Sequence, residues 1–129
     1  LTLRAHQDRS LAEGKGRFTC LVPLPFIPAG SGLSHLPGPS GVDQLRTLAA
    51  CRLMLDNVAH IKAFWVMLTP KLAQVSLAWG VDDLDGTVEQ YRIVGAGERH
   101  ALTVGELKGL IAEAGMTPCR RDSLYNAAG

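Results

Sequence analysis

Residues 52–88 alternate between helical and extended patterns with almost no spacer between them. An apolar helical repeat closes at residues 52–57, and the buried run HIKAFWVML follows at residues 60–68. The segment TPKLAQVSLAWG then indicates a second helix, and DDLDGTV at residues 82–88 indicates a second strand. Such alternation is typical of a parallel α/β sheet, in which ligands bind at the carboxyl ends of the strands.

The length of the chain limits how much of an α/β fold it can build. Its 129 residues are 47% hydrophobic and 19% charged, which is ordinary for a globular domain with a buried core. A complete eight-stranded barrel takes about 250 residues, whereas this chain has room for about three strand–helix units. We therefore expect an α/β fold that, if it belongs to a barrel, is only a part of one.

Charge and hydropathy argue against several kinds of partner. A formal net charge of +1 is too small for a nucleic-acid or membrane surface, and the densest basic spot, RRD at residues 120–122, is typical of solvated or paired surface. The chain contains no run of about 18 apolar residues and no signal-peptide pattern at its start. We expect a cytoplasmic protein that binds neither nucleic acid nor membrane.

The cysteines suit neither a disulfide nor a metal site. Cys20, Cys51 and Cys119 are far apart in the sequence and are interpreted as free, mostly buried thiols. The four histidines are scattered, and no phosphate loop or nucleophile elbow is present. Of these histidines, His35 is the best placed to touch a ligand, because it lies in a Gly/Pro-rich loop at residues 27–40.

Three carboxylates fall within four positions at the start of the last predicted strand. On a strand, Asp83 and Asp85 would point to one face and Asp82 to the other, which is poor geometry for one metal ion. We favour loop capping over a metal site and predict no metal in this chain. Gly86 lets a backbone approach a nucleotide closely and Thr87 adds a hydroxyl, so this stretch is interpreted as a binding site.

Local sequence signals predict the helices and the strand in the first half of the chain. Residues 1–14 indicate an amphipathic helix, and residues 17–26 a buried strand that Pro23 and Pro25 prevent from pairing along its whole length. Ser40 is expected to cap a helix at residues 41–55. The apolar positions expected to face the sheet from that helix are Val42, Leu45, Leu48, Ala49, Leu53 and Leu55.

Strand alternation and capping residues predict the elements of the second half of the chain. In the strand at residues 61–68, Lys62 is placed on the inward face, because a lysine packs poorly against helices. Thr69 caps the next helix, Pro70 takes its first position, and Gly80 ends it. The last elements expected are a strand at residues 84–88, a brief helix at 89–97, a helix opened by the Thr103/Glu106 capping box and stopped by Gly115, and an extended tail.

The sequence also resembles a known family. The words LDN, HIKAFWVMLTPKLAQ, DDLDGTV, LVPLPFIP, SHLPGPSGVDQL and RRDSLYN closely resemble the C-terminal part of the aminofutalosine synthases, radical S-adenosylmethionine enzymes of menaquinone biosynthesis. The resemblance spans nearly the whole chain. It implies that residues 1–129 are the C-terminal part of a radical S-adenosylmethionine (β/α)8 TIM barrel, with residues 98–129 as its closing helix and tail. The missing partner would be the N-terminal part of that barrel.

The resemblance implies a reaction and its cofactors. In this family a 5′-deoxyadenosyl radical derived from S-adenosylmethionine adds to 3-[(1-carboxyvinyl)oxy]benzoate, giving aminofutalosine and bicarbonate. The family holds its 4Fe-4S cluster on three closely spaced cysteines near the start of the barrel. No such trio occurs here, so the cluster ligands are expected to lie outside this chain, and the chain alone is expected to be inactive.

The substrate or S-adenosylmethionine pocket is expected to be shaped by residues from all three strands, with no catalytic residue assigned. They are Phe26, His35, Lys62, Phe64, Gly86, Thr87 and Glu89. Two alternatives stay open. One is the related dehypoxanthine futalosine cyclase, although such relatives usually have Gln where Lys62 stands. The other is a noncatalytic α/β binding or assembly module that associates with a partner or with itself through open sheet edges.

Overall fold

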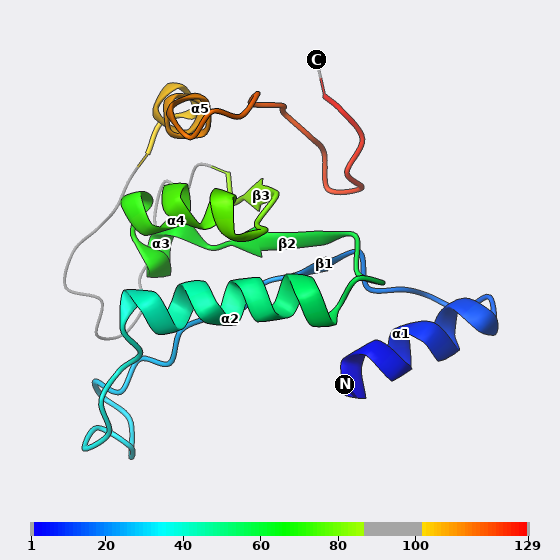
Figure 1. The fold of residues 1–129 in the computed structure, drawn as a ribbon, viewed down its shortest axis with the longest axis horizontal. Helices are drawn as coiled ribbons and strands as arrows, with labels where there is room; N and C mark the ends of the chain where they lie inside the picture. The colour runs from blue at the N-terminus through cyan, green and yellow to red at the C-terminus, as the bar shows by residue number, and fades with distance from the viewer. Residues whose placement is uncertain (1, 87–101, 129) are drawn as a thin grey trace.

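The computed structural model describes residues 2–86 and 102–128 (Figure 1). Helices and strands alternate through most of this part of the chain. In chain order the elements are α1 (Thr2–Ala12), β1 (Cys20–Leu21), α2 (Gly41–Met54), β2 (His60–Ala63), α3 (Trp65–Leu68), α4 (Pro70–Ser76), the 3-10 helix η1 (Leu77–Trp79), β3 (Asp83–Leu84) and α5 (Val104–Glu113).

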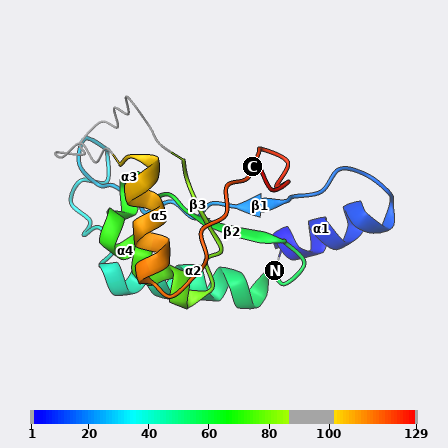
Figure 2. The ribbon, with the colours of Figure 1, turned by 90° about the horizontal axis from the view of Figure 1, so that it is seen from above.

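The three strands form one parallel sheet in the order β1-β2-β3, which confirms the predicted α/β class. Cys20 pairs with His60, and Lys62 pairs with Asp83, so β2 is the central strand. Figure 2 shows α2 and α4 beside the strands, and the C-terminal tail (residues 116–128) running from α5 past β3 and β2 to its end near β1. Closure into a barrel lies beyond what these three strands show and stays a prediction.

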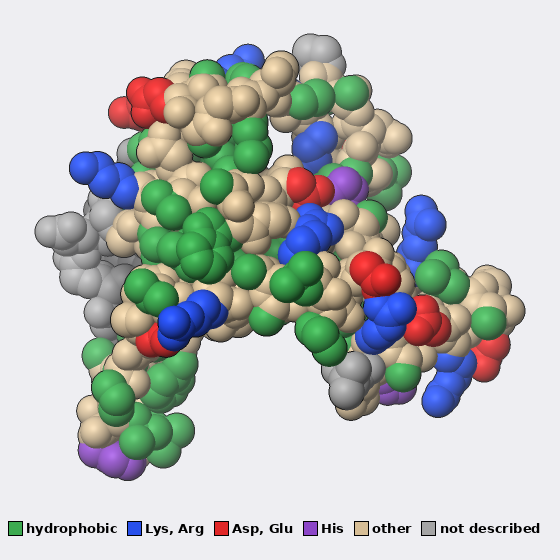
Figure 3. Space-filling view, viewed as in Figure 1, with side chains coloured by type: hydrophobic (Ala, Val, Ile, Leu, Met, Phe, Trp, Pro, Cys, Tyr) green, Lys and Arg blue, Asp and Glu red, His purple; other side chains and the backbone are tan. Residues whose placement is uncertain are grey.

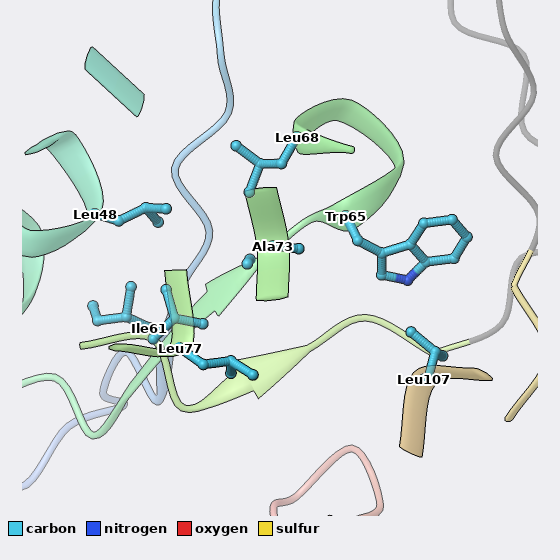
Figure 4. Close-up of a cluster of buried hydrophobic side chains, with 9 residues drawn as sticks. Leu48, Ile61, Trp65, Leu68, Ala73, Leu77 and Leu107 are labelled. Atoms are coloured by element: carbon cyan, nitrogen blue, oxygen red, sulfur yellow. The ribbon is translucent and has the colours of Figure 1, made fainter. Parts of the chain in front are cut away.

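The hydrophobic core lies between the sheet and its helices. Trp65 and Ile61 are fully buried, and they pack with Leu48 of α2, Leu77 of η1 and Leu107 of α5 (Figure 4). Trp65 also donates a hydrogen bond from Nε1 to the backbone carbonyl oxygen of Asp85, at 2.9 Å. The core therefore reaches directly to the residue that follows β3.

The strands are shorter than predicted. The strand expected at residues 17–26 is only Cys20–Leu21, because Pro23 and Pro25 offer no N–H for pairing. The strand expected at residues 61–68 ends at Ala63, and Trp65–Leu68 form the helix α3. A short apolar run suits a buried helix as well as a buried strand, so its composition could not separate the two. The predicted strand at 84–88 is Asp83–Leu84 as far as the described residues extend.

The predicted helix boundaries are confirmed at several caps. Ser40 and Thr103 each open a helix with a capping box, whose partners are Asp43 and Glu106. Thr69 caps α4 although its φ is 80°, and its hydroxyl accepts a hydrogen bond from the backbone N–H of Leu72.

Two apolar positions of α2 were predicted wrongly. Leu45, Leu48 and Leu55 are buried as expected, but Val42 is exposed and Leu53 is 79% exposed. Both side chains lie outside the stripe of α2 that meets the sheet.

Several other expectations can be placed on the described chain. Cys20 and Cys51 are partly buried, whereas Cys119 is exposed, so the expectation of mostly buried thiols is wrong for Cys119. The brief helix predicted at residues 89–97 lies outside the described residues. Among residues 2–86 and 102–128, the helices are all too short or too polar to cross a membrane.

Candidate functional site

The central strand β2 sends alternate side chains to opposite faces of the sheet. Ile61 and Ala63 are completely buried under the helices, whereas His60 and Lys62 are partly exposed on the other face. This arrangement agrees with the prediction that Lys62 faces away from the packed helices. The face that carries Lys62 is the one on which polar chemistry can occur.

Lys62 lies between two carboxylates of β3 and its extension. Its Nζ atom is 2.9 Å from Oδ1 of Asp85 and 3.8 Å from Oδ2 of Asp83. Asp83 and Asp85 thus share a face, as their spacing predicts for a strand. The side chain of Lys62 is only 17% exposed, so little water screens these ion pairs.

Asp83 is held mainly by the C-terminal tail. Arg121 approaches both of its carboxylate oxygens, at 2.6 and 3.2 Å, and the hydroxyl of Tyr125 donates to Oδ2 at 2.8 Å. The hydrogen bond to Asp83 raises the pKa of Arg121 above its ordinary value. Burial raises the pKa of Tyr125, and hydrogen bonds with Cys20 and Asp83 raise it further, so its phenol stays a donor.

A second charged group lies at the amino ends of β2 and β3. Asp82 accepts hydrogen bonds from Arg52, at 2.6 Å, and from the backbone N–H of Ile61, at 2.8 Å, and lies 2.8 Å from Nδ1 of His60. The ring of His60 stacks on Tyr125 with 3.8 Å between ring centroids. Figure 3 shows acidic, basic and histidine side chains meeting on the surface beside β2 and β3.

The polar face opens into a cavity of about 1010 Å³ between the sheet, α5 and the tail. Figure 3 shows the hollow between α5 and the body of the molecule. Lys62, Asp85 and Gly86 contribute its polar side, and Leu107 and Ile111 of α5 contribute an apolar side. An apolar wall with a few charged groups is typical of a small-molecule site.

The structure brings only part of the predicted site set together. Lys62 and Gly86 line the same cavity, whereas Phe26 lines a separate cavity of about 330 Å³ beside the proline-rich loop. Phe64 is buried at the end of β2, and His35 is exposed and lines neither of these two cavities. Thr87 and Glu89 lie outside the described residues. The binding role of the set stays a prediction.

Sequence reasoning missed the residues that surround Lys62. Loop capping was favoured for Asp83 and Asp85, although the stretch at Asp85 and Gly86 was also interpreted as a binding site, and Tyr125 was assigned no role. Arg121 belongs to the basic spot expected to be solvated or paired, and it is paired with Asp83. The spacing of Asp83 and Asp85 on one face of a strand, opposite a lysine of the neighbouring strand, is the signal that could have indicated them.

The three cysteines do not fit an iron–sulfur cluster. A 4Fe-4S cluster needs several thiolates around one centre, and within the described residues no three Cys, His, Asp or Glu side chains gather in a way that could hold a metal ion. Cys20, Cys51 and Cys119 are all free thiols, on or beside three different elements.

Comparison with known proteins gives this α/β segment a family. The parallel sheet, with its polar face lining a cavity, defines an α/β segment with a candidate small-molecule site. Residues 15–128 match the family described as the CofH/MqnC C-terminal region, and the chain belongs to this family.

Curated relatives agree with this assignment. The chain is 46% identical to the aminodeoxyfutalosine synthase of Thermus thermophilus, over 93% of the chain and 35% of the relative. It is 41% identical to the enzyme of the same name from Streptomyces coelicolor, over 91% and 34%. These matches confirm the resemblance to the aminofutalosine synthases.

Relatives with another name are also similar. The 5-amino-6-(D-ribitylamino)uracil–L-tyrosine 4-hydroxyphenyl transferase of Archaeoglobus fulgidus is 37% identical, over 92% of the chain and 36% of the relative. The chain therefore spans about a third of the length of the curated relatives it matches.

Proposed function

We propose that this chain supplies one substrate-facing sector of an aminofutalosine synthase. The enzyme would add a 5′-deoxyadenosyl group to 3-[(1-carboxyvinyl)oxy]benzoate and release aminofutalosine and bicarbonate. Identities of 46% and 41% to two aminodeoxyfutalosine synthases support this reaction over that of the transferase, at 37%, and over that of the cyclic dehypoxanthine futalosine synthase of Streptomyces coelicolor, at 31%.

The observation that carries the proposal is the position of Lys62. Its ammonium group lies on the cavity side of the central strand, one residue before β2 ends, and lines the same cavity as Gly86. The proposed substrate carries two carboxylates, and a partly buried ammonium binds a carboxylate through a charge-assisted hydrogen bond. Lys62 would exchange its contact with Asp85 for one substrate carboxylate and so orient the enol-ether double bond.

Other residues of the chain would hold this lysine in place and exclude water. Trp65 fixes the backbone of Asp85 from the core side, at 2.9 Å, and thereby fixes the partner of Lys62. Leu107 and Ile111 line the opposite side of the cavity with apolar surface. Such a wall protects a reactive intermediate from solvent, which is the protein's main task in cofactor-driven chemistry.

The cofactors of the proposed reaction would be S-adenosylmethionine and a 4Fe-4S cluster, which together supply the radical. Since the cysteines of this chain do not fit the cluster, we propose that its ligands belong to the part of the barrel that the longer relatives contain and this chain does not match. The chain by itself is then expected to produce no 5′-deoxyadenosine and no aminofutalosine.

A chimeric synthase tests the proposal. This chain would replace the matching segment of the Thermus thermophilus aminodeoxyfutalosine synthase, and the reconstituted enzyme would be given S-adenosylmethionine and 3-[(1-carboxyvinyl)oxy]benzoate. We expect mass spectrometry to detect aminofutalosine. Parallel reactions with dehypoxanthine futalosine, or with tyrosine and 5-amino-6-(D-ribitylamino)uracil, should give no product. Turnover of either alternative substrate instead would overturn the proposal.

Lysine variants of the chimera test whether Lys62 binds the benzoate substrate. Lys62→Gln should raise KM for the benzoate substrate by about 10- to 100-fold, because a hydrogen bond to a charged group is worth about 1.5–3 kcal/mol. Lys71→Gln is the matched control, since Lys71 is exposed in the first turn of α4 and lines neither cavity. Equal KM values for the two variants would exclude Lys62 from substrate binding.

A further inference from the structure

The carboxylate of Asp83 is shared unequally between the tail and Lys62. The tail supplies three short contacts, two from Arg121 and one from Tyr125, while Lys62 remains 3.8 Å away. Lys62 makes its short contact, at 2.9 Å, with Asp85 instead. Asp85 follows β3, so this choice moves the ammonium group toward the carboxyl end of the sheet.

We propose that Arg121 and Tyr125 are positioning residues for Lys62 that act through Asp83. This inference rests on the proposed function, because it concerns the lysine that would bind the substrate carboxylate. The tail satisfies the charge of Asp83, and Lys62 is thereby directed to Asp85 and the cavity. Neither tail residue is expected to touch the substrate.

The charges of this group explain why the tail is needed. Lys62 and Arg121 balance Asp83 and Asp85, so the four side chains together are neutral. Without Arg121, two carboxylates would share one ammonium group. Asp83, whose side chain is only 9% exposed, would then draw Lys62 toward itself, because a buried carboxylate without a partner is costly. The uncompensated negative charge would also repel an anionic substrate.

The tail is built to hold these two residues in one geometry. Tyr125 has φ 65°, a conformation that non-glycine residues adopt only when their surroundings enforce it. The ring of Tyr125 is stacked on the ring of His60. The guanidinium carbon of Arg121 lies 4.3 Å from the centroid of the Tyr125 ring. Asp122 closes the turn by accepting hydrogen bonds from Leu124 and Asn126.

Kinetics of the chimeric synthase test the inference. Arg121→Gln should raise KM for the benzoate substrate about tenfold while kcat changes less than about threefold, because a ground-state contact is lost. Adding Asp83→Asn should bring KM back to within about threefold of the parent, since the competing carboxylate is gone. A tail that served only stability would lower the fraction of active enzyme in Arg121→Gln and leave the KM of the folded enzyme unchanged. Arg46→Gln, an exposed arginine on α2, is the matched control.

A labelling measurement separates this inference from the proposed function. The unmodified chain and its Arg121→Gln variant would be treated with trace acetic anhydride, and acetylation of Lys62 relative to Lys71 would be read by mass spectrometry. We expect the variant to lose severalfold in Lys62 labelling, because the ammonium group would be drawn out of the cavity and against Asp83, where the reagent reaches it less easily. Unchanged labelling, or a double variant that stays as impaired as Arg121→Gln, would overturn the inference even if the chimera makes aminofutalosine. If the chimera makes no aminofutalosine, the acetylation of Lys62 in the unmodified chain and in Arg121→Gln still tests whether the tail positions this lysine.

Discussion

The two faces of the central strand are closed in different ways. Ile61 and Ala63 are sealed in an apolar core that they form with residues of α2, α4 and η1 and with Leu107 of α5. His60 and Lys62 face the other way, where ion pairs and a tail from the far end of the chain cover them. One face is therefore stabilised by burial, and the other is arranged by charge.

The contrast between the two faces shows how the fold can combine stability with a binding surface. Along β2 every second side chain is buried in the core, which holds the backbone rigid. Lys62 lies between the buried residues Ile61 and Ala63, so its ammonium group projects from a fixed position. Trp65 connects the two faces, because its ring is buried in the core while its N–H holds the backbone of Asp85. Stability variants should therefore separate into large effects on the helix face and small effects on the tail face.

The largest effect is expected at Trp65. Trp65→Ala would empty a fully buried site and remove a hydrogen bond, which should lower the free energy of unfolding by about 3–5 kcal/mol. Trp79→Ala is the matched control, because Trp79 is 40% exposed, and it should cost clearly less. Urea denaturation followed by circular dichroism measures both. Similar losses for the two variants would remove the distinction between a sealed face and an open one.

Gly80 is expected to give the next largest effect. It ends η1 with φ 95°, and an added Cβ would lie 2.8 Å from Cγ and 2.9 Å from Cβ of Arg52. Gly80→Ala should cost about 1–3 kcal/mol through backbone strain and displacement of that arginine. Gly109→Ala, in the open interior of α5, should instead stabilise the chain by about 0.5–1 kcal/mol. Thermal unfolding of both variants measures this difference in sign, and two destabilised proteins would contradict the explanation.

On the tail face, Tyr125→Phe should cost only about 1 kcal/mol. The variant loses the hydroxyl contact to Asp83, but Arg121 still holds both carboxylate oxygens. Leu124→Ala should be nearly neutral, because Leu124 is 79% exposed in the same turn. Chemical denaturation compares the two, and a loss at Tyr125 as large as that at Trp65 would show that the tail belongs to the core.

The smallest effect concerns pH and lies outside both faces. Hydrogen bonds from the backbone N–H of Thr103 and then from its hydroxyl lower the pKa of Glu106 below its ordinary value. A carboxyl whose pKa is depressed by folding adds stability above its unfolded pKa of about 4.3 and loses it as the pH falls through the folded value. The stability difference between the parent and Glu106→Gln should therefore shrink between pH 7 and pH 3. A difference independent of pH would contradict this cap.

Sequence patterns predicted the parts of the fold that depend on local chemistry. Capping residues such as Ser40, Thr69 and Thr103 act on neighbouring N–H groups, so their spacing was sufficient. The end of β2 could not be read in this way. The run HIKAFWVML is largely apolar along its whole length, although Ala63 ends a strand and Trp65 begins a helix.

The surroundings of Lys62 were beyond the sequence for a different reason. Arg121 and Tyr125 reach Asp83 across 38 and 42 residues of chain, and no local pattern connects them. Lys62 itself could be assigned to the polar face, because strand alternation is local. Its partners require the tertiary fold.

Protection of Lys62 by substrate tests the central claim most directly. The chimeric synthase would be labelled with trace acetic anhydride, with and without 3-[(1-carboxyvinyl)oxy]benzoate, and acetylation would be compared at Lys62 and the exposed Lys71. If Lys62 binds a substrate carboxylate, saturating benzoate should slow its labelling severalfold and leave Lys71 unchanged. Equal labelling of Lys62 in the presence and absence of the compound would contradict the assignment of this face to the substrate.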